Sequence, residues 1–202
     1  MIDRNWLIQR LENFPQRTIS RAGLRPAAVL LPLFADTCQD HVLFTVRTNH
    51  LHHHAGEISF PGGRQSHGDA NPCDTAIRET VEELGIPEKH IEILGRLDDY
   101  YSVHGYHVVP FVGLIPRPEN LKPDDFEIAQ VFDAPLNHFR NPEVHSVEDW
   151  SHQGRTAPVD FYHFAGHTIW GLTAAILKQF LMETVDAPDS KLESVKEAGL
   201  HR

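Results

Sequence analysis

Three glutamates lie close together near the middle of the chain, and an arginine precedes them. They are Glu79, Glu82 and Glu83, and the arginine is Arg78. Carboxylates at such spacing repel each other by about 1–4 kcal/mol per close pair at the dielectric values of a protein surface. A helix tolerates this repulsion when a cation compensates it, and hard divalent metal ions prefer oxygen ligands. The segment therefore indicates a site for a divalent metal ion, and a plain solvent-exposed acidic face is the alternative.

The residues from Pro72 to Leu84 have the pattern of an amphipathic helix that would position these carboxylates. At about 100° per residue, the three glutamates share one arc. The opposite arc, which we expect to pack against the core, contains Ile77, Thr80, Val81 and Leu84, with Cys73 and Ala76 beside it. Glu79 and Glu83 are one turn apart and stack, whereas Arg78 can pair with Glu82. We therefore expect Glu79 and Glu83 to be the better metal ligands, with Glu82 held by Arg78 or acting through water.

A glycine-rich turn leads into this helix. The residues from Phe60 to Asn71 contain F-P-G-G followed by further turn-forming residues. Glycines let a backbone approach a ligand closely, and helix N-termini favour phosphate. Asn71 can cap the start of the helix, and Gly85 can end it. The combination is more specific for a ligand site than an acidic helix alone.

The segment from Gly63 to Ile86 resembles the Nudix box, G-x5-E-x7-R-E-U-x-E-E-x-G-U, in which U is a bulky aliphatic residue. The matching positions are Gly63, Arg78, Glu79, Glu82, Glu83, Gly85 and Ile86. Thr80 occupies an aliphatic position of the box. Asp69 stands where the box has its first glutamate, and the spacing from Asp69 to Arg78 is one residue longer than in the general pattern. The changes at and after Asp69 resemble the coenzyme A pyrophosphatase branch of the family.

Other segments are similar to the same branch. Leu43 to Thr48 and Gly56 to Gly63 fit its upstream signature, roughly L-L-T-x-(T/R)-(S/T)-x4-R-x3-G-x3-F-P-G-G. His52 stands where that signature has an arginine. Downstream, Ser102 to Gly113 and Trp170 to Thr173 also resemble the branch. The likeness therefore covers most of the chain.

The resemblance implies a fold, a cofactor and an activity. The Nudix fold is a mixed β-sheet in an α/β/α sandwich, and the family hydrolyses diphosphates with Mg²⁺ or Mn²⁺. It implies that Glu79 and Glu83 are inner metal ligands, that Glu82 is an additional or water-bridged ligand, and that Arg78 positions the carboxylates. The backbone carbonyl near Gly63 is a further candidate ligand. The branch cleaves coenzyme A or an acyl derivative to 4′-phosphopantetheine (or its acyl form) and adenosine 3′,5′-bisphosphate by water attack on phosphorus.

The family places its general base variably. Glu127 occupies the kind of late acidic position that the family often uses, and Glu82 competes for the same role. A loop or strand-edge carboxylate without a catalytic role is the alternative for Glu127. Arg47 and Arg64 flank the glycine turn and are candidates to hold substrate phosphates, with ordinary surface charge as the alternative.

A histidine cluster occupies residues 50–54 and includes His52. His52 is a candidate phosphate contact because of its place in the signature, although neutral imidazole cannot form the two-pronged contact of a guanidinium. A solvated loop is one alternative for this cluster, and a transition-metal site is another.

Three other functions stay open. The box indicates a diphosphate without saying what is attached to it, so ADP-ribose, NADH or another nucleoside diphosphate derivative is the nearest alternative substrate. A ligand-sensing module without turnover is the second, because fold does not decide function. The intact acidic cluster disfavours it. A metal-handling protein built around residues 50–54 is the third.

The composition is that of an ordinary globular protein, with 202 residues, 41% hydrophobic residues and a net charge of −10 with neutral histidines. We expect one domain over residues 1–202, with its core at about 24–182 and a flexible tail over 186–202. The negative charge argues against nucleic-acid binding, and no apolar run approaches the length of a membrane span. The first residues lack the apolar core of a signal peptide, and two cysteines make no disulfide framework. We therefore expect a cytoplasmic enzyme with a small-molecule substrate, and a homodimer is one possible assembly.

The order of elements predicts a mixed α/β fold, because strands interleave with few helices and regular βαβ alternation is missing. Helices are expected at residues 3–14, 72–84 and 168–184, with a helical turn at 135–139. Strands are expected at residues 25–34, 41–47, 57–60, 91–98, 107–115, 127–132 and 159–164.

Overall fold

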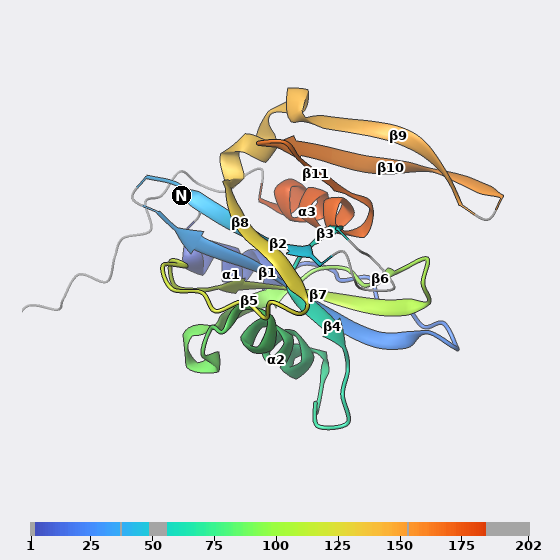
Figure 1. Ribbon diagram of the computed structural model, residues 1–202. Helices are drawn as coiled ribbons and strands as arrows, with labels where there is room; N and C mark the ends of the chain where they lie inside the picture. The colour runs from blue at the N-terminus through green and yellow to red at the C-terminus, as the bar shows by residue number, and fades with distance from the viewer. Residues whose placement is uncertain (1–2, 37, 49–55, 153, 185–202) are drawn as a thin grey trace, which may run out of the picture.

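Figure 1 shows a computed structural model of the chain, in which a mixed β-sheet forms the middle layer. The structure describes residues 3–36, 38–48, 56–152 and 154–184. Helix α2 (Pro72–Leu84) covers one face of the sheet, while α1 (Arg4–Glu12) and α3 (Gly171–Glu183) pack on the other. The expected mixed α/β fold with an α/β/α sandwich is therefore confirmed. Within the described ranges, each helix is too short or too polar to cross a lipid bilayer.

The main sheet has eight strands in the part of the chain that the structure describes. β1 pairs parallel with β7, and the other strand pairs are antiparallel. The order is β3-β2-β1-β7-β5, while β4 pairs with β1, β6 with β7 and β8 with β2. The strands are β1 (Arg25–Ala35), β2 (Asp40–Arg47), β3 (Ile58–Ser59), β4 (Gly62–Arg64), β5 (Glu92–Arg96), β6 (Tyr100–Tyr101), β7 (Tyr106–Leu114) and β8 (Ile128–Pro135).

A smaller antiparallel sheet follows the main one along the chain. Its order is β11-β10-β9, and in Figure 1 it lies on the far side of α3, so that this helix is enclosed between two sheets. The strands are β9 (His145–His152), β10 (Arg155–Phe164) and β11 (His167–Trp170). Short 3₁₀ turns are η1 (Glu88–His90) after α2, and η2 (Leu136–Arg140) and η3 (Pro142–Val144) between β8 and β9.

The alternation of side chains along β1 divides the core into two parts, because successive residues of a strand point to opposite faces. Leu31 and Leu33 belong to the cluster that packs with α1 and α3, while Leu30 and Phe34 belong to the cluster that packs with α2. Each such fully buried side chain contributes about 1.5–3 kcal/mol of hydrophobic stabilisation, which is an upper value. The sheet is thus buried on both faces, and Arg47 at the end of β2 reaches the α2 side.

Most expected elements are confirmed, and the helix over 72–84 agrees at both ends. The expected helix over 168–184 begins only at Gly171, because Thr168 to Trp170 continue β11 and pair with β10. Strand β9 was not predicted, since its sequence H-S-V-E-D-W-S-H lacks apolar alternation and is held by pairing with β10. β10 begins earlier than expected for the same reason, at Arg155.

The buried side of α2 differs from the expected arc. Thr80 and Leu84 are buried as expected, but Ile77 and Val81 are only half-buried. Glu83, which we expected on the open acidic face, is 3% exposed. The reason is tertiary, because the glycine turn at the start of β4 contacts this side of the helix and donates a backbone N–H to Glu83. Helical periodicity alone cannot include such a neighbour.

Candidate active site

Helix α2 is held at both ends by the residues that the sequence indicated. The Asn71 side chain accepts hydrogen bonds from the backbone N–H groups of Cys73 at 2.8 Å and Asp74 at 3.1 Å. Gly85 adopts a left-handed conformation with φ 69°, and its N–H donates to the carbonyl of Val81. These caps set where the helix begins and ends.

Arg78 binds three carboxylates at once. Its Nε and Nη2 donate to the two oxygens of Asp69 at 2.9 and 3.0 Å, so that the contact has two prongs. Its Nη1 donates to Glu82 at 2.8 Å, and its Nη2 also lies 2.9 Å from Glu79. The ion pair between Arg78 and Glu82 was expected from their spacing and is confirmed. The guanidinium is occupied on all sides, which suits a residue that positions carboxylates.

The electrostatics of Asp69 follow from this contact. Hydrogen bonds from Arg78 hold the pKa of Asp69 well below its usual range, and the Ser66 backbone N–H and the Thr75 hydroxyl also donate to this carboxylate. The same partner raises the pKa of Arg78 above its already high ordinary value. The sequence places Asp69 in the box without indicating a partner for it. The position of Asp69, nine residues before Arg78, was the available signal.

Gly63 makes room for Glu79. A Cβ atom at Gly63 would stand 2.5 Å from the carboxyl carbon of Glu79, a distance that real Cβ atoms do not reach. Any other residue at this position would push Glu79 away from β4. Burial raises the pKa of Glu79, and contact with Arg78 opposes that rise.

Glu83 is the most buried carboxylate of the cluster. Its Oε2 accepts from the backbone N–H of Gly62 at 3.2 Å, and its Oε1 lies 3.4 Å from Nη1 of Arg47. Burial raises the pKa of Glu83 to about 8, while Arg47 partly opposes this rise. A buried carboxylate whose ionised form is disfavoured by burial is typical of functional sites.

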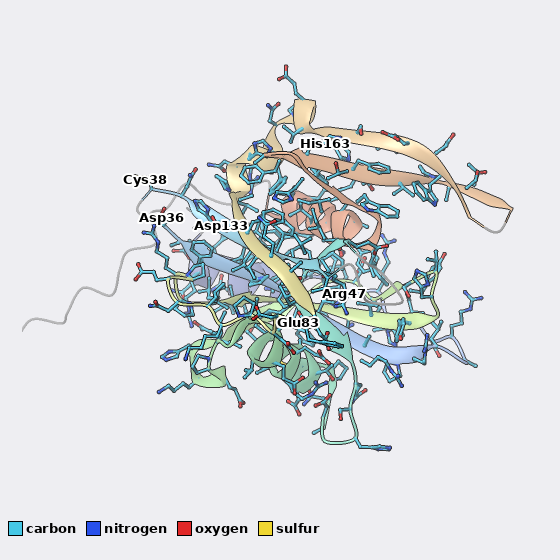
Figure 2. All side chains as sticks on the ribbon, in the orientation of Figure 1. Asp36, Cys38, Arg47, Glu83, Asp133 and His163 are labelled. Carbon is cyan, nitrogen blue, oxygen red and sulfur yellow. The ribbon has the colours of Figure 1, made fainter. Side chains whose placement is uncertain are left out.

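Strand pairing brings Glu127 to the same place. It directly precedes β8, which pairs antiparallel with β2, and its carbonyl accepts from the backbone N–H of Thr48. Nη2 of Arg47 lies 3.5 Å from Oε2 of Glu127, so that one guanidinium contacts both Glu83 and Glu127. Figure 2 shows Arg47 and Glu83 close together beneath β8. Arg47, which we predicted as a phosphate contact, is found beside carboxylates.

Arg64 and His52 are the remaining predicted site residues. The Arg64 side chain is exposed at the end of β4, and no ion pair joins it to another described residue, while its carbonyl accepts from Arg78. His52 and the rest of the cluster at 50–54 lie outside the described residues.

The side chains around α2 offer a divalent cation mainly carboxylate oxygens. Five carboxylates lie around two arginines, and they are Asp69, Glu79, Glu82, Glu83 and Glu127. Among the described residues, the fully ionised cluster therefore keeps an excess of negative charge. Their oxygens are the ligands that Mg²⁺ and Mn²⁺ prefer. Within those same residues, however, no three His, Cys, Asp or Glu side chains converge as a ready-made metal site. The chemistry of the donors fits the ion. The two arginines, however, pair with carboxylate oxygens that such an ion would need.

Comparison with known proteins agrees with this geometry. A NUDIX domain model matches residues 23–154. The chain is 38% identical over 159 residues to an uncharacterized Nudix hydrolase, NudL, of Photorhabdus laumondii, covering 79% of this chain and 84% of that protein. A NudL of Yersinia pestis is 35% identical, with 79% of each chain covered. A MutT/nudix family protein from Enterococcus faecalis shares the fold, with a TM-score of 0.51, 21% identity and coverage of 90% of this chain and 68% of that one.

The fold and the acidic helix thus define a hydrolase of phosphoric anhydrides. The chain belongs to the Nudix family of hydrolases.

Proposed function

We propose that this enzyme cleaves the diphosphate of coenzyme A or an acyl-coenzyme A with the help of Mg²⁺ or Mn²⁺. The products would be 4′-phosphopantetheine, acylated where the substrate was, and adenosine 3′,5′-bisphosphate. The observation that carries the proposal is the carboxylate cluster of α2, which has excess negative charge and lies against Gly63 of β4.

Four groups would hold the metal ion. Glu79 and Glu83 are proposed as direct ligands, the carbonyl near Gly63 as a further one, and Glu82 as an additional or water-bridged ligand. Support comes from the closeness of Glu79 to Gly63 and from the burial of Glu83. When bound, a divalent cation offsets the charge of the diphosphate and lowers the pKa of water.

The other residues would orient the reactants. Arg78 keeps Glu79 and Glu82 in place through its ion pairs with them, and Arg64 offers an exposed guanidinium to the anionic substrate. Glu127 is the proposed general base, because its side chain is 42% exposed and water can reach it. One water oxygen would bond to phosphorus while the bridging P–O bond breaks, and the water proton would pass to Glu127.

The choice of coenzyme A rests on the sequence signature. Leu43 to Thr48 and Gly56 to Gly63 fit the branch that acts on this substrate, and β2, β3 and β4 carry most of these residues. His52 replaces the arginine of the signature. We therefore propose that binding of the 3′-phosphate strengthens as this histidine becomes protonated below its reference pKa of about 6.5.

A substrate panel tests the proposal. Coenzyme A, ADP-ribose and NADH would be incubated with Mg²⁺ or Mn²⁺ in ¹⁸O-labelled water, and the products would be identified by mass spectrometry. Coenzyme A hydrolysis that stops on addition of a chelator is expected. Cleavage of ADP-ribose with coenzyme A untouched would overturn the substrate but keep the enzyme class. Tight binding without hydrolysis of any compound would instead favour the sensor.

A further inference from the structure

Arg47 occupies a central place between two carboxylates that come from distant parts of the chain. Its Nη1 lies 3.4 Å from Glu83, and its Nη2 lies 3.5 Å from Glu127. The side chain is 22% exposed, while the Glu83 side chain is 4% exposed. Arg47 therefore supplies the positive charge that faces Glu83 from β2, whereas Arg78 supplies it to Glu79 and Glu82 from within the helix.

The backbone around Arg47 is well held, so its side chain has a defined origin. Its N–H donates to the carbonyl of Glu57 at 3.0 Å, and its carbonyl accepts from the N–H of Gly56 at 3.1 Å. The next residue, Thr48, donates from its N–H to Glu127 at 2.9 Å and from its hydroxyl to Phe126 at 2.8 Å. The end of β2 and the start of β8 are thus joined directly at the point where Arg47 reaches toward α2.

Two arginines and a backbone N–H already occupy oxygens of the two glutamates that would bind the metal ion. One Glu83 oxygen is directed to Arg47 and the other to the N–H of Gly62. Glu79 is directed to Arg78 in the same way. A divalent ion that takes Glu83 must compete with Arg47, because like charges at such separation repel strongly in a partly buried site.

We propose that Arg47 is a positioning residue that holds Glu83 and Glu127 together in the metal-free protein and releases Glu83 when a divalent cation binds. This inference rests on the proposed function, since it needs a metal ion at Glu83. Its consequence is that Arg47 weakens metal binding while it stabilises the metal-free fold.

Mn²⁺ binding tests the inference without any turnover. The probe is Mn²⁺ alone, counted as free ion by electron paramagnetic resonance during titration of the full chain. Arg47→Gln is expected to bind Mn²⁺ about three- to tenfold more tightly than the wild type, since one competing charge is gone. The same variant is expected to melt at a lower temperature in the presence of a chelator. A purely structural role for Arg47 would lower the stability without tightening the binding.

Two further variants complete the design. Arg47→Lys keeps the charge but not the two-pronged shape, and its Mn²⁺ affinity is expected to lie between those of the wild type and Arg47→Gln. Should Arg47→Gln fail to fold, tighter binding by Arg47→Lys would support the inference. Arg117→Gln is the matched control, because Arg117 pairs with Asp36 and Glu119 away from α2, and its affinity should equal that of the wild type.

The outcomes separate this inference from the function on which it rests. Wild-type binding of Mn²⁺ together with unchanged or weaker binding by Arg47→Gln and Arg47→Lys would overturn the inference alone. Absence of Mn²⁺ binding in the wild type would overturn both the metal dependence and the inference.

Discussion

Two ionic clusters of this protein use similar side chains to opposite effect. In the outer layer, Asp160 of β10 accepts from Lys178 of α3 and from His145 of β9, each at 2.7 Å. In the site, Glu83 meets one guanidinium at 3.4 Å and one backbone N–H at 3.2 Å. Burial by itself would raise the pKa of either carboxylate. At Asp160 the hydrogen bonds from Lys178 and His145 outweigh burial, and the net pKa is lowered. The pKa of Glu83 is raised to about 8.

The difference separates an ion pair that supports structure from one that leaves chemistry open. The Asp160 cluster joins β9, β10 and α3, and its carboxylate has two partners. The α2 cluster has more carboxylates than arginines among the described residues, so its fully ionised form needs a further cation. A local charge excess in a partly buried cluster is a functional indication, whereas a compensated cluster is not.

The largest effect is expected for Glu83→Gln. Turnover should fall by at least about 100-fold, more than the usual cost of losing a residue that only orients a metal ligand. The variant should still fold, because glutamine can accept from the N–H of Gly62 as glutamate does. Steady-state kinetics with saturating Mg²⁺ measure the change. Wild-type turnover by a folded Glu83→Gln protein would remove the distinction drawn between the two clusters.

Gly63→Ala should come next. The new methyl group would stand 2.5 Å from the Glu79 carboxyl carbon, so the carboxylate must move. We expect Mn²⁺ affinity to fall by about 10–100-fold. Gly68→Ala, in the same turn, is the matched control because no atom lies within 4 Å of a Cβ there. Equal affinities of the two variants would show that Glu79 does not need its place beside Gly63.

Asp160→Asn should act on stability alone. Removing the charge leaves Lys178 and His145 without their shared carboxylate, at a cost of about 1–3 kcal/mol in the free energy of unfolding. Urea denaturation measures this loss, and kcat should match that of the wild type. Glu119→Gln serves as control, since its pair with Arg117 is solvent-exposed and distant, at 3.9 Å. A large fall in kcat for Asp160→Asn would link the outer sheet to the chemistry.

The smallest effect is a pH dependence that differs in sign between the clusters. The pKa of Glu83 is higher in the folded protein than the ordinary 4.5, so the folded state binds its proton more tightly. Stability of the chelator-treated protein should therefore fall as the pH rises from 4.5 toward about 8. Asp160 has a lowered pKa, so its contribution is present above the ordinary aspartate range and is lost in acid.

Thermal unfolding of the metal-free protein across this pH range measures the dependence. Glu83→Gln should flatten the fall at higher pH, while Asp160→Asn should leave that fall unchanged and reduce the loss in acid. A wild-type stability that rises steadily toward pH 8 would contradict the burial of an ionisable Glu83.

Much of the site was readable along the chain because its signals are local. Asn71, Pro72 and Gly85 mark the ends of α2, and each acts within a few residues of itself. The pair between Arg78 and Glu82 is likewise decided by helical spacing. By contrast, β9 has no local strand pattern and exists because β10 pairs with it, which explains why it was not predicted.

The sequence by itself determined the length of α2, the order of its charged side chains and the family to which the chain belongs. Only the tertiary structure decided that Glu83 is buried and that Arg47 joins it to Glu127. Those contacts link residues 36 and 80 positions apart, so they depend on how β2, β8 and α2 pack together. Periodicity reports which side chains share a face of one element, and it carries no information on what the neighbouring element places against that face.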